Sequence, residues 1–356
     1  MKTILAIDSF KGCMSSSEVE ETIAGVLNKN GLETLCLPMS DGGEGMLPVF
    51  TSAMGGTLEP VYIHDQMMRR VDAQYGVMPD GTAIIEVAQA CGLTIVKEEE
   101  RNPMRSTTYG VGELLSRAIK RGCRNFIIGL GGTGTSDAGI GMIRALVDIF
   151  ARGKSFDEAL KTELGECRFT LASDVDNPLC GKNGAAHVYA PQKGATPEMV
   201  EQLDRRARLF AEKSALHFGF DKSNEPGAGA AGGLGYAFIQ YLGAEMKSGA
   251  DLLLDLTDFN GKIKDADLIM TGEGSADRQT LMGKLPQRIL MRGKQLGVPV
   301  GLVAGRVEDR EELLSAGFSF VESITPEGMP LEEAIKKEVA FSNLRRFATS
   351  LVYEKT

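Results

Sequence analysis

Residues 4–37 read ILAIDSFKGCMSSSEVEETIAGVLNKNGLETLCL and predict a β-strand, a helix and a second β-strand, in that order. The apolar run at 4–7 is typical of a short buried strand. Ser15-Ser16-Ser17-Glu18 forms a capping box, and apolar residues then recur at helical spacing until Gly31. The next strand begins at Leu35. This β-loop-α-β unit is typical of a parallel sheet in an α/β fold.

The chain is long enough for two domains, because 356 residues exceed what one hydrophobic core usually serves. From residue 57 the parallel pattern gives way to short alternating runs, which are typical of a small meander. The parallel pattern returns near residue 262, where the expected strands are 268–270, 300–304 and 318–321. We therefore predict a discontinuous first α/β domain at 1–58 plus 262–356, with a second α/β domain inserted at 59–261.

Composition and charge exclude several classes of protein. Hydrophobic residues make up 43% and charged residues 24%, which are globular values, and the net charge is −9. A nucleic-acid or anionic-membrane surface needs basic patches, so neither partner is expected. No apolar run reaches the ~18 residues that span a membrane, and the short apolar N-terminal run does not suit a signal peptide. Six cysteines without metal-site spacing indicate reduced thiols in a cytoplasmic protein.

Acidic residues follow several of the predicted strands and lie beside glycines: Asp8, Asp41, Asp174, Glu273 and Asp277. One such Asp alone is more often a turn or N-cap residue. Ligands of open α/β sheets bind outside the carboxyl ends of the strands, and these five residues come from both predicted domains. We therefore expect one active-site cleft between the domains, in which facing carboxylates could hold Mg²⁺.

A glycine motif follows the strand predicted at 126–130. Residues 129–134, GLGGTG, match G-x-G-x-x-G between a strand and a helix, the context that a phosphate-binding turn requires. Dinucleotide binding needs an acidic residue that closes a second strand, whereas Asp148, at the right spacing, falls in a predicted helix. Phosphate contact through backbone N–H groups is therefore favoured, with a plain strand-to-helix turn as the alternative. A second glycine-rich segment at 226–235 predicts either a flexible hinge or a close-packed loop.

Lys11 lies between the first strand and its capped helix. An ammonium group there, beside the free N–H groups of the helix start, could hold a carboxylate or a phosphate. A solvated surface lysine is the alternative, but the setting DSFKG at 8–12 favours a ligand.

Seven blocks of sequence together resemble the type I glycerate kinase family. They are DSFKG at 8–12, MSDGGEG at 39–45, the glycine segment 129–141, SDVDNPL at 173–179, PQKGA at 191–195, the segment 226–235, and TGEG at 271–274 with Asp277, Gln279, Thr280, Gly283 and Lys284. The resemblance covers nearly the whole chain, and so many blocks in order make it specific. It implies ATP-dependent phosphorylation of D-glycerate, in bacteria usually at the 2-hydroxyl, giving 2-phosphoglycerate and ADP. It also implies a permuted, discontinuous Rossmann/flavodoxin-like domain and one inserted α/β domain.

Phosphoryl transfer mainly requires positioning and charge neutralisation, which gives each candidate residue an expected role. The expected catalytic residues are Asp8, Lys11, Asp41 and Asp174, with Asp8 or Asp41 orienting or deprotonating the hydroxyl. The expected substrate contacts are Ser9, Asp277 and Lys284. The expected contacts of the ATP phosphates are Gly131, Gly132, Thr133, Gly134 and Asp137. Mg²⁺ would bridge those phosphates from Asp174 or Asp277.

Three alternatives stay open at this point. A kinase for another small hydroxy acid would use the same groups. A non-catalytic metabolite-binding regulator would keep the fold, although a sensor needs no metal-binding carboxylates. An NAD-dependent dehydrogenase is disfavoured, because this chain has no acidic residue that closes a second strand at the required spacing. A homodimer is expected only because dimers are common among metabolic enzymes.

Overall fold

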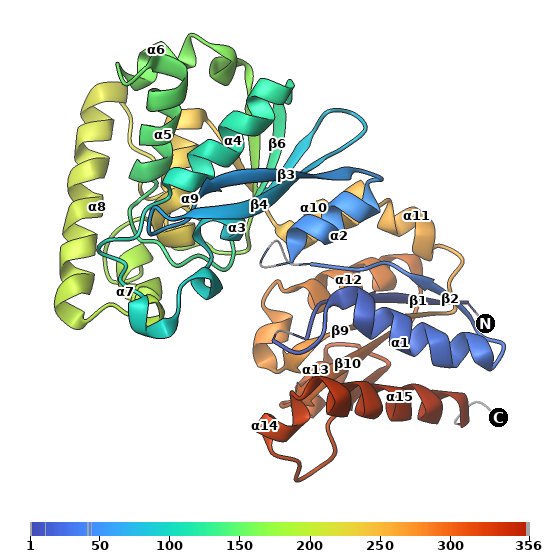
Figure 1. Cartoon of the computed structure of the whole chain (residues 1–356). Helices are drawn as coiled ribbons and strands as arrows, with labels where there is room; N and C mark the ends of the chain where they lie inside the picture. Colours follow the sequence, from blue (N-terminus) through green and yellow to red (C-terminus); the bar gives the residue numbers. More distant parts are fainter. Residues whose placement is uncertain (1, 11, 41–42, 44, 354–356) are drawn as a thin grey trace. The chain divides into compact units, whose positions relative to one another are not determined.

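The structure is a computed structural model that describes residues 2–10, 12–40, 43 and 45–353. The chain forms two compact units: unit 1 is Met1–Asp41 with Ala250–Thr356, and unit 2 is Gly42–Gly249. Each unit contains one sheet that is mostly or wholly parallel (Figure 1). The predicted α/β class is therefore confirmed. Among the described residues, no helix is long and apolar enough to cross a membrane.

Unit 1 is built on a five-stranded parallel sheet in the order β11-β10-β9-β1-β2. The strands are β1 (Lys2–Ile7), β2 (Glu33–Cys36), β9 (Leu268–Ala276), β10 (Val300–Val307) and β11 (Phe320–Ser323). The helices are α1 (Ser16–Lys29), α10 (Gly249–Leu256), α11 (Phe259–Ile263), α12 (Leu285–Leu296), α13 (Arg310–Ser315), α14 (Leu331–Ala334) and α15 (Lys337–Tyr353), with the 3₁₀ turn η5 (Arg278–Leu281). The β-loop-α-β unit predicted at residues 4–37 is present as β1, α1 and β2.

The helices of unit 1 cover both faces of its sheet. Leu5 and Met270 face a core to which α1 and α15 contribute, and Figure 1 shows these two helices side by side. On the opposite face α12 packs so closely that a Cβ at Gly293 would lie 2.3 Å from Val300 and 3.4 Å from Ile269. Successive residues of a strand point to opposite faces, which is why Ile269 and Met270 contact different helices.

The start of α1 follows the predicted capping box. The Ser15 hydroxyl accepts the Glu18 N–H at 3.3 Å, and the Glu18 carboxylate accepts the Ser15 N–H at 2.9 Å. These bonds satisfy two backbone N–H groups without helical partners, which stabilises the helix by about 1 kcal/mol. The Ser16 hydroxyl donates to the Ile7 carbonyl and accepts the Met39 N–H, so the helix start is also tied to β1 and to the segment after β2.

Strands β9 and β10 run further than the sequence pattern predicted. Pairing continues to Ala276 in β9 and to Val307 in β10, beyond the predicted ends of both strands. Glycines permit this extension, because a Cβ at Gly305 would lie only 2.5 Å from the Gly274 carbonyl oxygen. Glu273, which was expected in a loop, is therefore held inside a strand.

Unit 2 is built on a six-stranded sheet in the order β3-β4-β5-β6-β7-β8, antiparallel from β3 to β5 and parallel from β5 to β8. The strands are β3 (Thr57–His64), β4 (Arg70–Val77), β5 (Ala83–Glu86), β6 (Asn125–Gly129), β7 (Arg168–Ala172) and β8 (Glu245–Lys247). The helices are α2 (Met46–Ala53), α3 (Ala88–Cys91), α4 (Tyr109–Arg121), α5 (Ile140–Ala151), α6 (Phe156–Leu160), α7 (Ala185–Tyr189), α8 (Pro197–Phe218) and α9 (Ala230–Leu242). Four 3₁₀ turns are η1 (Leu93–Ile95), η2 (Glu98–Glu100), η3 (Glu163–Glu166) and η4 (Pro191–Lys193). The predicted meander is present as β3, β4 and β5.

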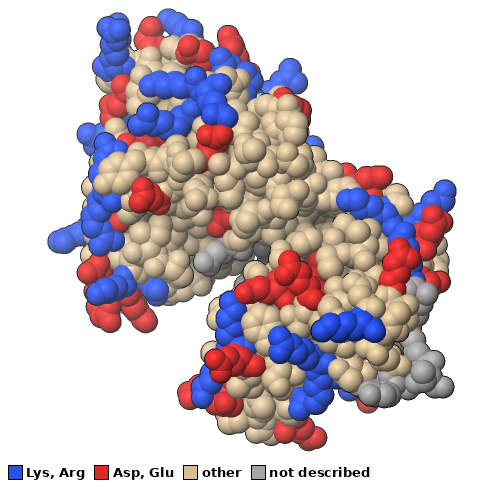
Figure 2. Space-filling model, turned by 45° about the vertical axis from the view of Figure 1, so that its right-hand side comes forward, with Lys and Arg blue, Asp and Glu red and all other residues tan. Residues whose placement is uncertain are grey.

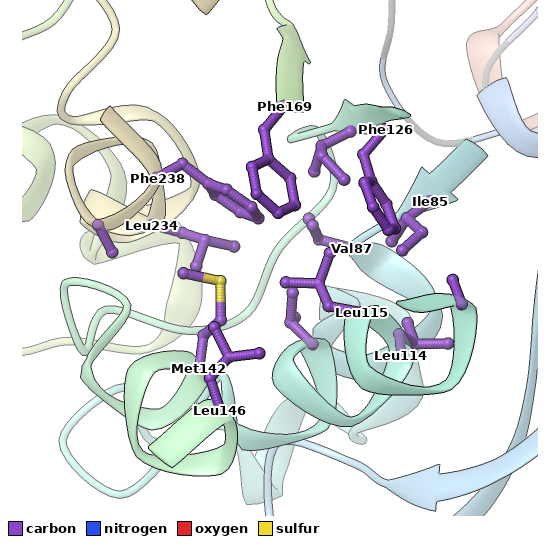
Figure 3. Packing of buried hydrophobic residues seen from close by; sticks show 14 of the residues in the cluster. Ile85, Val87, Leu114, Leu115, Phe126, Met142, Leu146, Phe169, Leu234 and Phe238 are labelled. Carbon is purple, nitrogen blue, oxygen red and sulfur yellow. The ribbon is translucent and has the colours of Figure 1, made fainter. Parts of the chain in front are cut away.

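The core of unit 2 joins this sheet to helices α4, α5 and α9 (Figure 3). The Phe126 and Phe169 rings stack with their centroids 5.0 Å apart, and the Phe238 ring of α9 lies 5.8 Å from that of Phe169. Leu114 of α4 and Met142 of α5 are fully buried in the same cluster. Truncating one such residue to alanine costs about 2–5 kcal/mol, so this core holds the central strands firmly in place.

The boundary between the two units differs from the predicted boundaries at 58 and 262. Helix α2 and strand β3 belong to unit 2, which starts at Gly42 and ends at Gly249. Packing explains the difference for α2: a Cβ at Gly76 of β4 would lie 2.4 Å from the Thr51 hydroxyl of α2. The apolar pattern of a short helix indicates that one face is buried, but not which sheet buries it.

The glycine-rich segment 226–235 is a close-packed loop that leads into α9. A Cβ at Gly229 would lie 2.3 Å from the Pro178 carbonyl oxygen, and one at Gly232 would lie 2.1 Å from that of Thr135. Gly232 also has φ +67°, a backbone conformation that favours glycine. These glycines let separate loops of unit 2 approach one another, which supports the close-packed interpretation of the segment rather than a hinge.

Candidate active site

The chain connections of unit 1 diverge between β1 and β9. The chain leaves β1 through α1 to reach β2 on one side, and it leaves β9 through α12 to reach β10 on the other. Because α1 and α12 cover opposite faces of the sheet, the carboxyl ends of β1 and β9 form a topological switch point. Open α/β sheets bind their ligands at such points.

A cavity of about 1310 Å³ lies at these strand ends. Its polar end is lined by Asp8 and Ser9 after β1, by Glu273 in β9 and by Lys284 at the start of α12. Asp8 is only 8% exposed; its carboxylate accepts the Ser9 N–H at 2.7 Å, and its own N–H donates to the Gly272 carbonyl at 3.0 Å. The structure therefore brings together three residues that the sequence predicted for the site: Asp8, Ser9 and Lys284.

Glu273 is the centre of a small polar network at this end of the cavity. Its Oε1 accepts a hydrogen bond from the Thr280 hydroxyl at 2.6 Å, and its Oε2 lies 3.5 Å from the Lys284 ammonium. Burial raises the pKa of Glu273, whereas Thr280 and Lys284 act in the opposite direction. The Lys284 side chain is 41% exposed, so its ammonium can still meet an anionic ligand. The sequence predicted Glu273 as one of the acidic residues that follow a strand, and it gave this residue no separate role.

Asp277 is a described residue that does not line this cavity. Its carboxylate caps η5 and accepts the Gln279 N–H at 2.7 Å, while its own N–H donates to the Thr280 hydroxyl at 3.0 Å. Because Thr280 in turn donates to Glu273, Asp277 positions the network at the cavity. A contact of Asp277 with glycerate or Mg²⁺ stays a prediction.

Lys11 and Asp41 lie outside the described residues, so their expected roles stay predictions. The chain soon after Asp41 is held by Glu86, the last residue of β5, which is 3% exposed. The Glu86 carboxylate accepts the N–H groups of Gly45 and Leu47 at 3.2 and 3.0 Å. A carboxylate is favoured at this position because the N–H groups of a helix start carry partial positive charge. No motif or spacing in the sequence indicated this role for Glu86.

The glycine loop 131–134 of unit 2 follows β6 and is tied to the segment after α3. The Gly134 N–H donates to the Cys91 carbonyl at 2.7 Å, and the Gly132 carbonyl accepts the Leu93 N–H at 2.8 Å. The loop is thus fixed by backbone pairing, and the N–H of Gly134 already has an acceptor. Its expected contact with the ATP phosphates stays a prediction.

Asp137 anchors the start of α5. One carboxylate oxygen accepts the Gly141 N–H at 3.0 Å, and the other accepts the Gly139 N–H at 3.1 Å. Thr108, the residue before α4, donates to the same carboxylate through its N–H at 2.9 Å and through its hydroxyl. These bonds link the starts of α4 and α5, so they assign Asp137 a structural role. Its expected nucleotide contact stays a prediction.

Lys193 is a candidate residue to which the sequence interpretation assigned no role. It ends η4 and is 2% exposed, and its ammonium donates to the Thr135 carbonyl at 2.6 Å and to the Thr133 hydroxyl at 3.3 Å. Burial lowers the pKa of Lys193 to about 8, although nearby Asp137 acts in the opposite direction. A cation therefore lies directly behind the glycine loop. The signal in the sequence is the block PQKGA at 191–195.

Asp174 follows β7 at the same sheet edge as the glycine loop. Gly129 of β6 pairs with Ala172 of β7, so the two segments that follow leave neighbouring strands at the same level. The Asp174 side chain is exposed. Within the described part of the chain, no three His, Cys, Asp or Glu side chains are grouped to hold a metal ion. The predicted role of Asp174 in catalysis or metal binding stays a prediction.

The chain has a net charge of −9, and Figure 2 shows Asp and Glu interspersed with Lys and Arg over the face that it presents. An anionic substrate must therefore be held by local cations rather than by the overall field. Among the described residues these include Lys284 and Arg306 in the cavity of unit 1 and Lys193 behind the loop of unit 2.

Comparisons with known proteins agree over the whole length of the chain. The model of the glycerate kinase family matches residues 3–353. The chain is 37% identical over 378 residues to a glycerate kinase of Bacillus subtilis (strain 168), which covers 100% of this chain and 99% of that protein. It is 35% identical over 377 residues to a glycerate 2-kinase of Escherichia coli (strain K12), with 99% and 97% covered. A crystal structure of a Salmonella typhimurium LT2 protein assigned as glycerate kinase 2 is similar with a TM-score of 0.82 and 34% identity, covering 99% of this chain and 98% of that chain.

Proposed function

The chain belongs to the glycerate kinase family, and we propose that it transfers the terminal phosphoryl group of ATP to the 2-hydroxyl of D-glycerate, giving 2-phosphoglycerate and ADP. The observation that carries this proposal is the cavity at the switch point of unit 1. There a buried carboxylate, a hydroxyl and an ammonium group converge at the ends of two neighbouring strands. These are the groups that orient an alcohol and neutralise the charge of a moving phosphoryl group.

In this proposal the polar end of the cavity receives the reacting groups. Lys284 and Ser9 face the glycerate carboxylate or the moving phosphoryl group, a role in which Lys11 is expected to join them. Asp8 orients or deprotonates the acceptor hydroxyl, with Asp41 as the alternative base. Glu273 holds the Lys284 ammonium near the cavity, because the two side chains form an ion pair at 3.5 Å.

The ATP phosphates are proposed to contact Gly131, Gly132, Thr133 and Gly134, with Asp137 nearby. The pairing of this loop with the segment after α3, and the Lys193 ammonium behind it, support a fixed site for an anion. A fixed loop needs no ordering when the nucleotide binds, so more of the contact energy is available for positioning. The expectation that both units contribute to one substrate site stays a prediction.

Asp174 or Asp277 is proposed to bind Mg²⁺. Their carboxylate oxygens suit this hard cation, which usually takes one or two protein carboxylates and completes its shell with phosphate oxygens and water. Of the Asp277 carboxylate, Oδ1 accepts the Gln279 N–H. When bound, Mg²⁺ would neutralise charge on the nucleotide phosphates. The homodimer and the cytoplasmic location likewise stay predictions.

An enolase-coupled assay tests the proposed reaction and its product together. Purified protein is incubated with ATP, Mg²⁺ and D-glycerate, and phosphoenolpyruvate is followed by ultraviolet absorbance after enolase is added. Enolase converts 2-phosphoglycerate but not 3-phosphoglycerate, so signal with enolase alone supports transfer to the 2-hydroxyl. Signal that requires added phosphoglycerate mutase would show transfer to the 3-hydroxyl instead. If no ADP forms with D-glycerate, the glycerate proposal fails, and a panel of other small hydroxy acids separates a different kinase from a non-catalytic binding protein.

A further inference from the structure

The cavity of unit 1 extends well beyond its polar end. Its volume of about 1310 Å³ exceeds the roughly 300–1,000 Å³ of most small-molecule pockets, and glycerate is only a three-carbon acid. The remaining wall is formed by the end of β11, the segment that follows it and α14: Ile324, Pro326, Met329, Leu331, Ala334 and Ile335. Glycerate bound at the polar end would leave this part of the cavity open to another ligand.

The wall carries an exposed apolar surface. Leu331 is 61% exposed and Ile335 is 48% exposed, and their spacing of four residues places them on one face of α14 and its C-cap. Single exposed hydrophobic residues are ordinary, but this pair lines a cavity beside the buried Ile324 and Ala334. An apolar surface of this kind, in a cavity that is also lined by charged side chains, fits a flat ring that is attached to an anion.

Charged side chains line the rest of the cavity. Arg310 pairs with Glu322, and both line the cavity, so neither adds net charge to it. Lys284 and Arg306 are the other cations in the lining. Lys284 pairs with Glu273 at 3.5 Å and Arg306 with Glu308 at 3.0 Å, but their side chains are 41% and 64% exposed, so both can still meet an anionic ligand. For a ligand with its ring against α14, the cationic side chains that could contact its anionic part therefore lie toward the ends of β9 and β10, at the polar end.

From this arrangement we infer that the α14 wall of the unit 1 cavity binds the adenine and ribose of the nucleotide, with the phosphate chain directed toward Arg306 and Lys284. The inference rests on the proposed ATP-dependent transfer and adds the location of the base. It follows the general behaviour of open α/β sheets, which take nucleotides at a switch point of strand order. The phosphate contacts predicted at 131–134 stay a separate prediction.

A tryptophan reporter tests the base site directly, because the chain contains no tryptophan. In the Leu331→Trp variant the new indole is the sole tryptophan and faces the cavity. Titration with ADP is expected to quench its emission in a saturable way, since the adenine ring stacks against it. The matched control is Leu296→Trp, because Leu296 is 41% exposed at the end of α12 and does not line the cavity. Quenching in both variants, or in neither, would overturn the inference.

A kinetic comparison separates this inference from the proposed function. Ile335→Asp places a carboxylate in the proposed base site, and it is expected to raise the KM for ATP at least tenfold with little change in the KM for D-glycerate. Inorganic triphosphate, which lacks a base, is expected to inhibit wild type and Ile335→Asp equally. A wild-type protein that forms no ADP would overturn the proposed function. An active protein in which Ile335→Asp leaves the KM for ATP unchanged, or raises only that for glycerate, would overturn the base site alone.

Discussion

Replacing Lys193 with methionine tests whether a buried ammonium supports the glycine loop. The pKa of Lys193 in the native state is about 8, against 10.5 for an ordinary lysine, so burying its charged form costs about 3 kcal/mol at pH 7. Its hydrogen bonds to Thr135 and Thr133 offset this cost by about 1–3 kcal/mol. Methionine has a similar length and removes both effects. The free energy of unfolding at pH 7 should therefore change by no more than about 2 kcal/mol.

The pH dependence of stability is the sharper part of this prediction. Because the pKa of Lys193 is lower in the native state than in the unfolded chain, the unfolded chain binds more protons between about pH 8 and pH 10.5. The contribution of this group to stability therefore rises with pH in that window and is constant well below pH 8. From pH 7 to pH 9 it adds about 1 kcal/mol to wild type. It adds nothing to the Lys193→Met variant.

Urea unfolding, followed by far-ultraviolet circular dichroism at pH 7 and pH 9, measures this difference. The gap in unfolding free energy between wild type and Lys193→Met should move by about 1 kcal/mol in favour of wild type at the higher pH. Lys213→Met, which removes an exposed lysine from α8, controls for the general loss of a positive charge. A gap that stays constant between the two pH values would refute the burial argument, whatever its size.

Three further substitutions test other parts of the structure. Gly232→Ala should lower the free energy of unfolding by about 2–4 kcal/mol, because its Cβ would meet a carbonyl oxygen at 2.1 Å. The control Gly243→Ala, with φ +61° and no atom within 4 Å of the new Cβ, should lower it by only about 1 kcal/mol. Equal losses in chemical denaturation would contradict the packing argument. Thr280→Val removes a hydrogen bond that lowers the pKa of Glu273, so the acid limb of the pH profile of kcat/KM should move to higher pH. An acid limb that does not move would show that Glu273 does not affect the reaction. Asp137→Asn should lower the free energy of unfolding by about 1–3 kcal/mol; unchanged stability with a tenfold higher KM for ATP would instead support nucleotide contact.

Local sequence signals predicted the elements around the unit 1 cavity. The capping box at Ser15 and the apolar run before Asp8 act over a few residues, so the sequence alone located β1, the start of α1 and the strand end between them. Asp8 could therefore be predicted as a candidate site residue from these short-range signals, whereas Ser9 was included through its family block. Lys284 was included through its family block, and the fold brings it to the same cavity.

Long-range contacts account for what the sequence did not predict. Lys193 lies 58 residues from the carbonyl that it contacts, and no periodicity reports such a pairing. The extension of β9 depends on glycines in two neighbouring strands, so the pattern of one strand alone placed its end too early. The position of Asp137 just after the glycine loop predicted a ligand contact. In the structure its carboxylate instead accepts hydrogen bonds from backbone N–H groups that only the fold brings to it.

The central claim is that the cavity at the carboxyl ends of β1 and β9 holds the reacting groups. The most direct measurement is the turnover of Asp8→Asn with ATP and D-glycerate, beside Asp265→Asn, which changes an exposed residue of the same unit. We expect Asp8→Asn to lose about 10²–10⁴-fold in kcat and to keep its free energy of unfolding within about 1 kcal/mol of wild type. The control Asp265→Asn should stay fully active. Near-normal turnover of a folded Asp8→Asn protein would contradict it.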